Sequence, residues 1–164
     1  FTVSIGLQCK GETVLGVVYA PYLNELYEAC KGKGAMLNGR SIHVSGKNDT
    51  QESVVSTGFP IDKDRNPDNN LDNLARILPM VRGVRRQGSA AFDLCCVAAG
   101  ILDGYWEFNL HLWDVCAGIL IVTEAGGTVR SFREDRNVPI VVGTPAIVEQ
   151  LYPRLSDKPG KICL

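Results

Sequence analysis

The chain has 164 residues, of which 45% are apolar, so it can bury a core as one globular domain or slightly more. Its 17 basic and 18 acidic side chains leave a net charge of −1, which argues against binding to nucleic acid or to an anionic membrane surface. The longest apolar run, residues 115–122 with one glycine inside it, is much shorter than the about 20 residues that span a bilayer.

Cysteines are spread along the whole chain, at Cys9, Cys30, Cys95, Cys96, Cys116 and Cys163. No Cys-x-x-Cys pair occurs among them, so their spacing does not support a zinc site. An even count is compatible with disulfides. Scattered cysteines in a chain with an ample core are more typical of buried free thiols, and we therefore expect a reducing, cytoplasmic compartment.

Residues 1–44 read as an antiparallel meander. Apolar and polar residues alternate from Phe1 to Lys10, which predicts a half-buried strand beginning at the first residue. A strand that starts so abruptly, without an initiating Met, leads us to expect that the natural chain extends upstream. Val-rich residues 13–19 and residues 25–30 predict further strands, and Asn38-Gly39 is a strong hairpin signal.

After a polar connection, strands and helices alternate. The spacing of apolar residues and breakers predicts strands at 53–57, 83–86, 103–108, 128–132 and 139–142. It predicts one helix that begins at Asn66-Pro67-Asp68 and three further helices at 89–99, 113–125 and 144–155. Strands first and alternation afterwards indicate an α/β (α+β) layered sandwich. We expect residues 1–50 to belong to an antiparallel-sheet domain and 51–164 to an α/β domain that faces the substrate.

Two carboxylates occupy positions suited to chemistry. Glu107 ends a predicted strand and Asp114 starts the following helix, and such positions gather at one edge of a layered fold. Because the helix after Asp114 is almost entirely apolar, that carboxylate should be partly desolvated and stabilised by backbone N–H groups, by a cation or by both. The alternatives are that Asp114 only caps its helix and that Glu107 is a solvated strand-end acid.

The turn Gly88-Ser89-Ala90 is a third candidate. It follows a strand and opens a helix, so its unpaired amides suit a phosphate or a polyol oxygen, although Ser89 could also be a plain helix cap. Arg82, Arg85 and Arg86 flank this turn and could steer an anionic substrate or simply form a solvated strand face.

Residues 113–127 resemble the second signature of the inositol monophosphatase family, Trp-Asp-x-Ala-Ala-Gly followed by an apolar stretch and Glu-Ala-Gly-Gly. Cys116 replaces the usual Ala. Similarity to the family also extends over residues 85–91, 103–107 and 1–7, and over Gly32-Lys33-Gly34-Ala35 with the following Leu37-Asn38-Gly39.

The resemblance implies an α-β-α-β-α sandwich of the sugar-phosphatase type, present here in part, and hydrolysis of a small-molecule phosphate monoester with Mg²⁺. It implies that Asp114 binds metal and substrate and that Glu107 contacts a substrate hydroxyl. Gly88, Ser89 and Ala90 would line the substrate pocket, and Arg85 falls near another position that meets the ligand. Members of the family tend to dimerise, so a homodimer is expected.

The family's first signature, Asp-Pro-x-Asp-Gly-Thr, and a further metal-binding Glu are not in this chain. They supply most metal ligands and the Thr that orients the attacking water, so we assign no catalytic residue and expect this chain alone to be inactive or nearly so. Inositol monophosphate is the favoured substrate, with histidinol phosphate, fructose bisphosphate or adenosine bisphosphate as alternatives. Other possibilities are a non-catalytic binding or dimerisation module and a glycosidase that uses Glu107 and Asp114 as its carboxylate pair.

Overall fold

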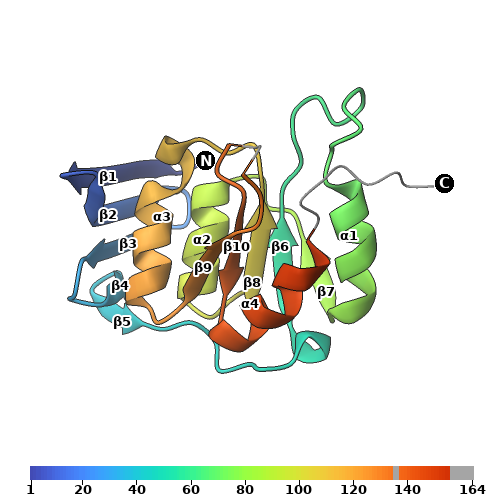
Figure 1. The fold of residues 1–164 in the computed structure, drawn as a ribbon. Helices are drawn as coiled ribbons and strands as arrows, with labels where there is room; N and C mark the ends of the chain where they lie inside the picture. The colour runs from blue at the N-terminus through green and yellow to red at the C-terminus, as the bar shows by residue number, and fades with distance from the viewer. Residues whose placement is uncertain (135–136, 156–164) are drawn as a thin grey trace.

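The computed structural model describes residues 1–134 and 137–155, which form four layers (Figure 1). An antiparallel sheet, here called the N-terminal sheet, is followed by a pair of helices, a second and mixed sheet, and an outer layer of helices. These are four layers of the α-β-α-β-α sandwich that the sequence predicts. The remaining helical layer of such a sandwich would pack on the outer face of the N-terminal sheet.

The N-terminal sheet confirms the predicted meander. Its strands pair in sequence order and antiparallel to one another. They are β1 (Val3–Cys9), β2 (Glu12–Ala20), β3 (Glu25–Cys30), β4 (Ala35–Leu37) and β5 (Arg40–Ile42). Asn38 and Gly39 connect β4 to β5 with φ angles of 49° and 73°, the left-handed geometry that favours Asn-Gly in two-residue hairpins.

Strand β1 alternates as predicted, but its apolar side is not the buried one. Val3, Ile5 and Leu7 remain 48%, 57% and 57% exposed on the outer face of the sheet. The inner face approaches the helical layer so closely that a Cβ on Gly6 would collide with the Cys116 sulfur. A glycine therefore suits the inner position 6, and the apolar row faces outward, toward the side where the fifth layer of the sandwich would pack.

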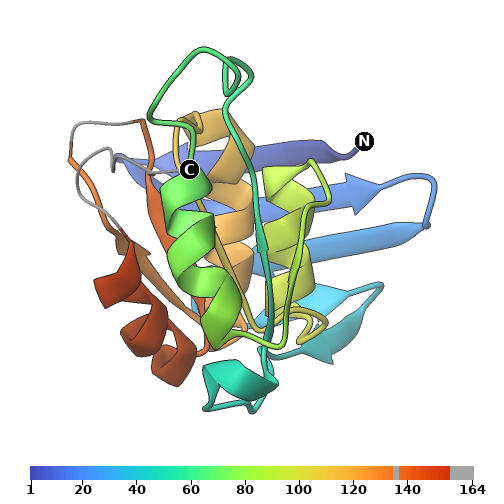
Figure 2. The same ribbon diagram turned by 90° about the vertical axis from the view of Figure 1, so that its right-hand side faces the viewer.

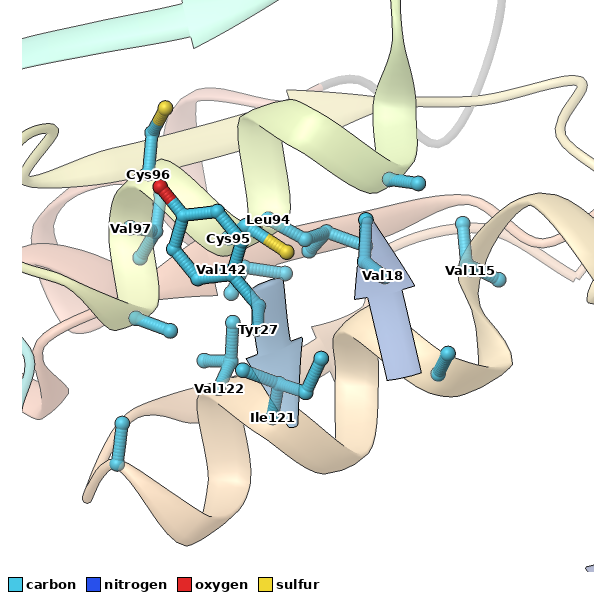
Figure 3. Packing of buried hydrophobic residues seen from close by; sticks show 14 of the residues in the cluster. Val18, Tyr27, Leu94, Cys95, Cys96, Val97, Val115, Ile121, Val122 and Val142 are labelled. Atoms are coloured by element: carbon cyan, nitrogen blue, oxygen red, sulfur yellow. The ribbon is translucent and has the colours of Figure 1, made fainter. Parts of the chain in front are cut away.

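Two helices, α2 (Ala90–Ala98) and α3 (Leu112–Glu124), lie between the sheets. The core that they share with both sheets is shown in Figure 3, where Tyr27 and Val18 from the N-terminal sheet approach Leu94, Ile121 and Val142. All five of these side chains are fully buried. One continuous core therefore contains residues from both sides of position 50. The division into two domains at that position, which the sequence suggested, remains a prediction.

The mixed sheet has the strand order β7-β6-β8-β10-β9. Its members are β6 (Val54–Thr57), β7 (Gly83–Arg85), β8 (Gly104–Glu107), β9 (Thr128–Ser131) and β10 (Ile140–Gly143). Strands β7, β6 and β8 run parallel, whereas β10 runs antiparallel to β8 and to β9. The carboxyl ends of β6, β7 and β8 consequently meet at one edge, as parallel strands must.

The outer layer consists of α1 (Leu71–Ile77) and α4 (Pro145–Leu151), each continued by a 3₁₀ turn, Leu78–Met80 and Tyr152–Arg154 respectively (Figure 2). A third 3₁₀ turn, Thr50–Glu52, precedes β6. A second core lies beneath this layer. Its largest fully buried members are Ile77, Trp106, Phe108, Ile147 and Leu151.

Helix α1 begins later than the sequence predicts. The Asn66 side chain accepts a hydrogen bond from the Asp68 N–H, which forms a local turn rather than a helix start. Asn70, with a φ angle of 73°, precedes the first helical residue. The last helix does start as predicted, since Thr144 accepts a hydrogen bond from the Ile147 N–H, but its regular part ends at Leu151.

The carboxylate of Glu124 joins the end of α3 to the loop after β3. It accepts hydrogen bonds from the N–H groups of Gly32 and Gly34, at 2.7 and 2.8 Å. These backbone contacts lower the pKa of Glu124. Because its partners include these backbone amides, the Glu-Ala-Gly-Gly segment of the signature acts as a structural joint between α3 and the N-terminal sheet.

The five described cysteines are free thiols, as predicted. Cys95 and Cys96 are buried, but Cys9 and Cys30 are exposed on strand ends, which corrects the expectation that the cysteines are buried; Cys163 lies outside the described residues. Within the described part of the chain, the structure contains no helix with the length and apolarity that a membrane crossing requires.

The close approach of α3 to the N-terminal sheet can be tested at Gly16. A Cβ there would lie 2.7 Å from the Ala117 carbonyl oxygen and 3.0 Å from its Cα, and backbone cannot rotate away. We expect Gly16→Ala to lower the free energy of unfolding by about 1–3 kcal/mol in urea titrations, as overpacking does. Gly46→Ala, at a glycine with open space around it, is the matched control and should cost much less. Equal effects of the two substitutions would contradict the packing described here.

Candidate active site

A pocket of about 520 Å³ lies at the edge where β6, β7 and β8 end. The chain leaves these strand ends in the upper part of Figure 1. Five of the six residues that the sequence singled out line the pocket: Gly88, Ser89, Ala90, Glu107 and Asp114. Arg85 does not. The other lining residues are Phe1, Thr2, Ser4, Gly58, Phe59, Ile61, Arg86, Ala91, Leu110 and Trp113.

Asp114 lies in the first turn of α3, and its Oδ2 accepts the His111 N–H at 2.8 Å. The interpretation of Asp114 as the N-cap is wrong, because His111 occupies that position and Asp114 is the third helical residue. The His111 ring is stacked on Trp113, with centroids 4.3 Å apart. This partly buried carboxylate is therefore held at the mouth of the pocket by the backbone that precedes its own helix.

Glu107 is half-buried at the end of β8 and is not a freely solvated acid. Its Oε2 accepts a 2.5 Å hydrogen bond from the hydroxyl of Tyr105. Burial raises the pKa of Glu107, and the nearby charge of Asp114 acts in the same direction. The Tyr105 hydrogen bond and the charge of Arg86 oppose that rise. Burial and the Asp114 charge thus disfavour the ionised form of Glu107, and a cation or a hydrogen-bond donor that enters the pocket would stabilise it.

The turn before α2 presents free amides to the same pocket. Ser89 is the N-cap residue by its extended backbone, but its hydroxyl makes no capping hydrogen bond. That hydroxyl instead lies 3.2 Å from the Thr2 hydroxyl on the N-terminal segment. The plain-cap alternative therefore does not describe Ser89, and the first turn of α2 keeps N–H groups for a phosphate or polyol oxygen.

The basic residue that reaches the pocket is Arg86. Arg85, the last residue of β7, is exposed and donates to the Val84 carbonyl oxygen, whereas Arg86 lines the pocket. The Arg86 guanidinium lies beside Gly88, where an added Cβ would be 3.2 Å from Nη1. Strand alternation could have separated the two arginines, since neighbouring residues at a strand end face opposite ways.

Sequence reasoning also missed the segment after β6. Gly58, Phe59 and Ile61 form one wall of the pocket. Glu107 was identified because residues at strand ends gather at one edge of a layered fold. The same reasoning applies to residue 58, which directly follows the strand predicted at 53–57. The missing information was that β6 and β8 are adjacent and parallel, with Thr57 opposite Trp106.

A third carboxyl group, that of Asp93 on α2, does not line the pocket but lies close enough to Glu107 for their charges to interact, and it is 1% exposed. Within the described residues, neither its Oδ1 nor the buried Ser56 hydroxyl meets the geometry of a hydrogen bond. The pKa of Asp93 is raised to about 7, chiefly by burial and also by the charge of Glu107, while the nearby Ser56 hydroxyl and the charge of Arg86 oppose the rise. Asp93 is thus predominantly neutral in mildly acidic solution and becomes charged near neutral pH.

The described residues do not by themselves fit a complete metal centre. Residues 1–134 and 137–155 contain no group of three His, Cys, Asp or Glu side chains placed to hold a metal ion. Mg²⁺ prefers six oxygen ligands in near-octahedral geometry, of which Asp114 could provide one or two. Any metal at this pocket would need ligands from elsewhere.

The profile of the inositol monophosphatase family matches residues 1–158. The chain belongs to this family. A protein named inositol-1-monophosphatase from Synechocystis is 46% identical over 130 residues, which are 79% of this chain and 45% of the relative. Proteins named Nus factor SuhB are also similar, and that of Pasteurella multocida is 40% identical over 96% of this chain and 62% of its own length.

Solved structures agree with this assignment. The inositol monophosphatase of Anabaena superposes with a TM-score of 0.87 at 38% identity, covering 93% of this chain and 62% of the other. SuhB of Mycobacterium tuberculosis gives a TM-score of 0.83 at 37% identity. The chain thus spans about three fifths of the length of several relatives. The family is one of metal-dependent phosphatases, which fits an acidic pocket with an incomplete set of metal ligands.

The unusual environment of Asp93 predicts a pH-dependent stability. Its folded-state pKa of about 7 lies above its unfolded value, so the fold favours the protonated form and loses stability as the pH rises from about 4 to 7. Asp93→Asn should therefore gain stability relative to the unmodified protein at pH 8, on the order of 2–4 kcal/mol, and less at pH 4.5. Urea unfolding at both pH values measures this. The exposed Asp64→Asn is the control, and an equal pH trend in both variants would contradict the assignment.

Proposed function

We propose that this chain forms the substrate-facing part of a magnesium-dependent phosphatase that hydrolyses inositol monophosphate or a related polyol or sugar phosphate monoester. The observation that supports this most is the convergence of Glu107, Asp114 and the Gly88-Ser89-Ala90 turn on one pocket. These residues come from three separate elements, and they are the positions to which the family resemblance attaches ligand contacts.

Each group has a role that follows from its chemistry. Glu107 accepts a hydrogen bond from a substrate hydroxyl, because its carboxylate is half-buried and lines the pocket. The first-turn amides of α2 and the Arg86 guanidinium attract anionic or hydroxyl oxygens of the substrate. Asp114 supplies one carboxylate to Mg²⁺, which would stabilise negative charge on the phosphate. We infer that the other metal ligands lie outside this chain, which alone should be inactive or nearly so.

Compartment and assembly belong to the same proposal. The free cysteines fit a reducing compartment, which supports a cytoplasmic location. Because members of the family tend to dimerise, we propose a homodimer, which sedimentation analysis of the full-length gene product can test. Nothing in the charge of the chain favours a nucleic-acid or membrane partner.

Substrate choice can be measured by phosphate release from the full-length gene product that contains this chain, with Mg²⁺ present. We expect inositol monophosphate to give a higher kcat/KM than histidinol phosphate, fructose bisphosphate or adenosine bisphosphate, because the chain belongs to the inositol monophosphatase family and is 46% identical to a protein named inositol-1-monophosphatase. The isolated chain should release almost none. Release by the isolated chain at an ordinary enzymatic rate would contradict the proposed division of ligands.

Asp114→Asn separates the metal role of this residue from its role in the helix. The amide keeps an oxygen for the His111 N–H but lacks the negative charge that a divalent cation needs, so the fold should persist. We expect kcat/KM of the full-length protein to fall roughly 100-fold or more. The exposed Asp64→Asn should leave activity unchanged. Full activity of Asp114→Asn at low Mg²⁺ would exclude Asp114 as a ligand.

A second candidate is a non-catalytic binding module. It is favoured by one observation, that several relatives covering nearly this whole chain are named Nus factor rather than phosphatase. The residues encoded immediately before Phe1 discriminate between the two. An Asp-Pro-x-Asp-Gly-Thr segment there supports the enzyme, and other residues in its place support the binding module.

A further inference from the structure

The carboxylate of Glu107 is held from below by Tyr105. Both residues lie on β8, two positions apart, so both side chains point to the same face of the mixed sheet. The Tyr105 ring is fully buried, and its hydroxyl donates to Glu107 Oε2 at 2.5 Å. Since a buried tyrosine ring has few alternative positions, the hydrogen bond also fixes the orientation of the carboxylate.

The same carboxylate is held from the side by the backbone of Gly58. A Cβ at residue 58 would overlap the Glu107 side chain and would be equally close to Cδ and to both oxygens. Within the plane of the carboxylate, the one point equally distant from these three atoms is the centre of the circle that passes through them. The added Cβ would be farther from the atoms than that centre is, so it must lie above or below the plane of the group. The carboxylate therefore lies with one face against Gly58, an approach that any larger residue would block.

Gly58 is itself kept in place by a buried network. Asn70 Nδ2 donates to the Gly58 carbonyl oxygen at 2.7 Å and to the Thr57 hydroxyl at 2.9 Å. Asn70 Oδ1 accepts the indole N–H of Trp106 at 3.0 Å. Trp106 lies between Tyr105 and Glu107 on β8 and points to the opposite face, so the network ties the position of Gly58 to the strand that carries Glu107.

We propose that Tyr105 and Gly58 are positioning residues for Glu107, which together orient its carboxylate so that Oε2 is occupied and Oε1 is left to accept one substrate hydroxyl. The identity of the ligand in this inference rests on the proposed function, whereas the positioning of Glu107 does not depend on it. Neither residue needs to touch the substrate for this role. The selectivity of the pocket for a hydroxyl beside the phosphate then depends on a tyrosine hydroxyl buried behind it.

Ligand binding tests the role of Tyr105. Calorimetric titration of the full-length gene product, with Mg²⁺ present, should show that Tyr105→Phe weakens binding of inositol monophosphate roughly tenfold, which is the effect of losing one hydrogen bond to a charged group. Binding of inorganic phosphate, which has no ring hydroxyl, should not change. Tyr27→Phe is the matched control, because Tyr27 is also fully buried and donates to a glutamate two residues away, Glu25, at 2.7 Å.

A double-mutant cycle separates positioning from general damage. In a Glu107→Gln background, Tyr105→Phe should weaken binding of inositol monophosphate by less than twofold further, because there is no carboxylate left to orient. A full tenfold loss in that background, or an equal loss of inorganic phosphate binding, would overturn the inference.

Crystal structures decide the positioning independently of catalysis. In Gly58→Ala and in Tyr105→Phe, the Glu107 carboxylate should leave its place, whereas Gly46→Ala and Tyr27→Phe should leave it unchanged. If the Glu107 carboxylate keeps the position it has in the unmodified protein in both variants, the inference is wrong even if the protein is a phosphatase. If Glu107 moves as expected while the unmodified protein neither binds nor hydrolyses polyol phosphates, the proposed function fails and the positioning stands.

Discussion

The parallel pairing of β6 with β8 is the constraint on which the site depends. It places Thr57 opposite Trp106, so the residues that follow the two strands, Gly58 and Glu107, emerge at the same edge. The connections from this edge lead into α1 and α3, and β7 on the other side of β6 leads into α2. A shift of one residue in this pairing would turn Glu107 to the opposite face and remove it from the pocket.

Charge in the pocket follows from that arrangement. Asp93, Glu107 and Asp114 come from α2, β8 and α3, and the first two are sufficiently buried that their pKa values rise. Arg86 is the basic residue lining the pocket and opposes the rise for both. A partly buried acidic site of this kind is costly without a cation, and it is typical of sites that have a function rather than a structural role. The family membership gives a reason for this cost, since the inositol monophosphatase family is generally metal-dependent.

Much of this could be predicted from local patterns. The meander over residues 1–44, the last helix start at Thr144 and the gathering of Glu107, Asp114 and the Gly88 turn are confirmed, because each depends on turn chemistry, caps or strand ends that are visible in the sequence. The errors arose where a tertiary contact overrides a local preference. Asn66-Pro67 resembles a helix start, yet α1 begins only after Asn70, whose side chain bonds Gly58 and Trp106 far away in sequence.

The sequence by itself determined the element order, the family and most of the candidate residues that line the pocket, because alternation, breakers and the signature of residues 113–127 are local properties. Only the tertiary structure decided which side of β1 is buried, which arginine enters the pocket, and that Gly58 and Tyr105 enclose Glu107. These depend on how closely the layers approach and on which strands are neighbours in the sheet. Such distances are set by packing between segments tens of residues apart, and no window of sequence contains them.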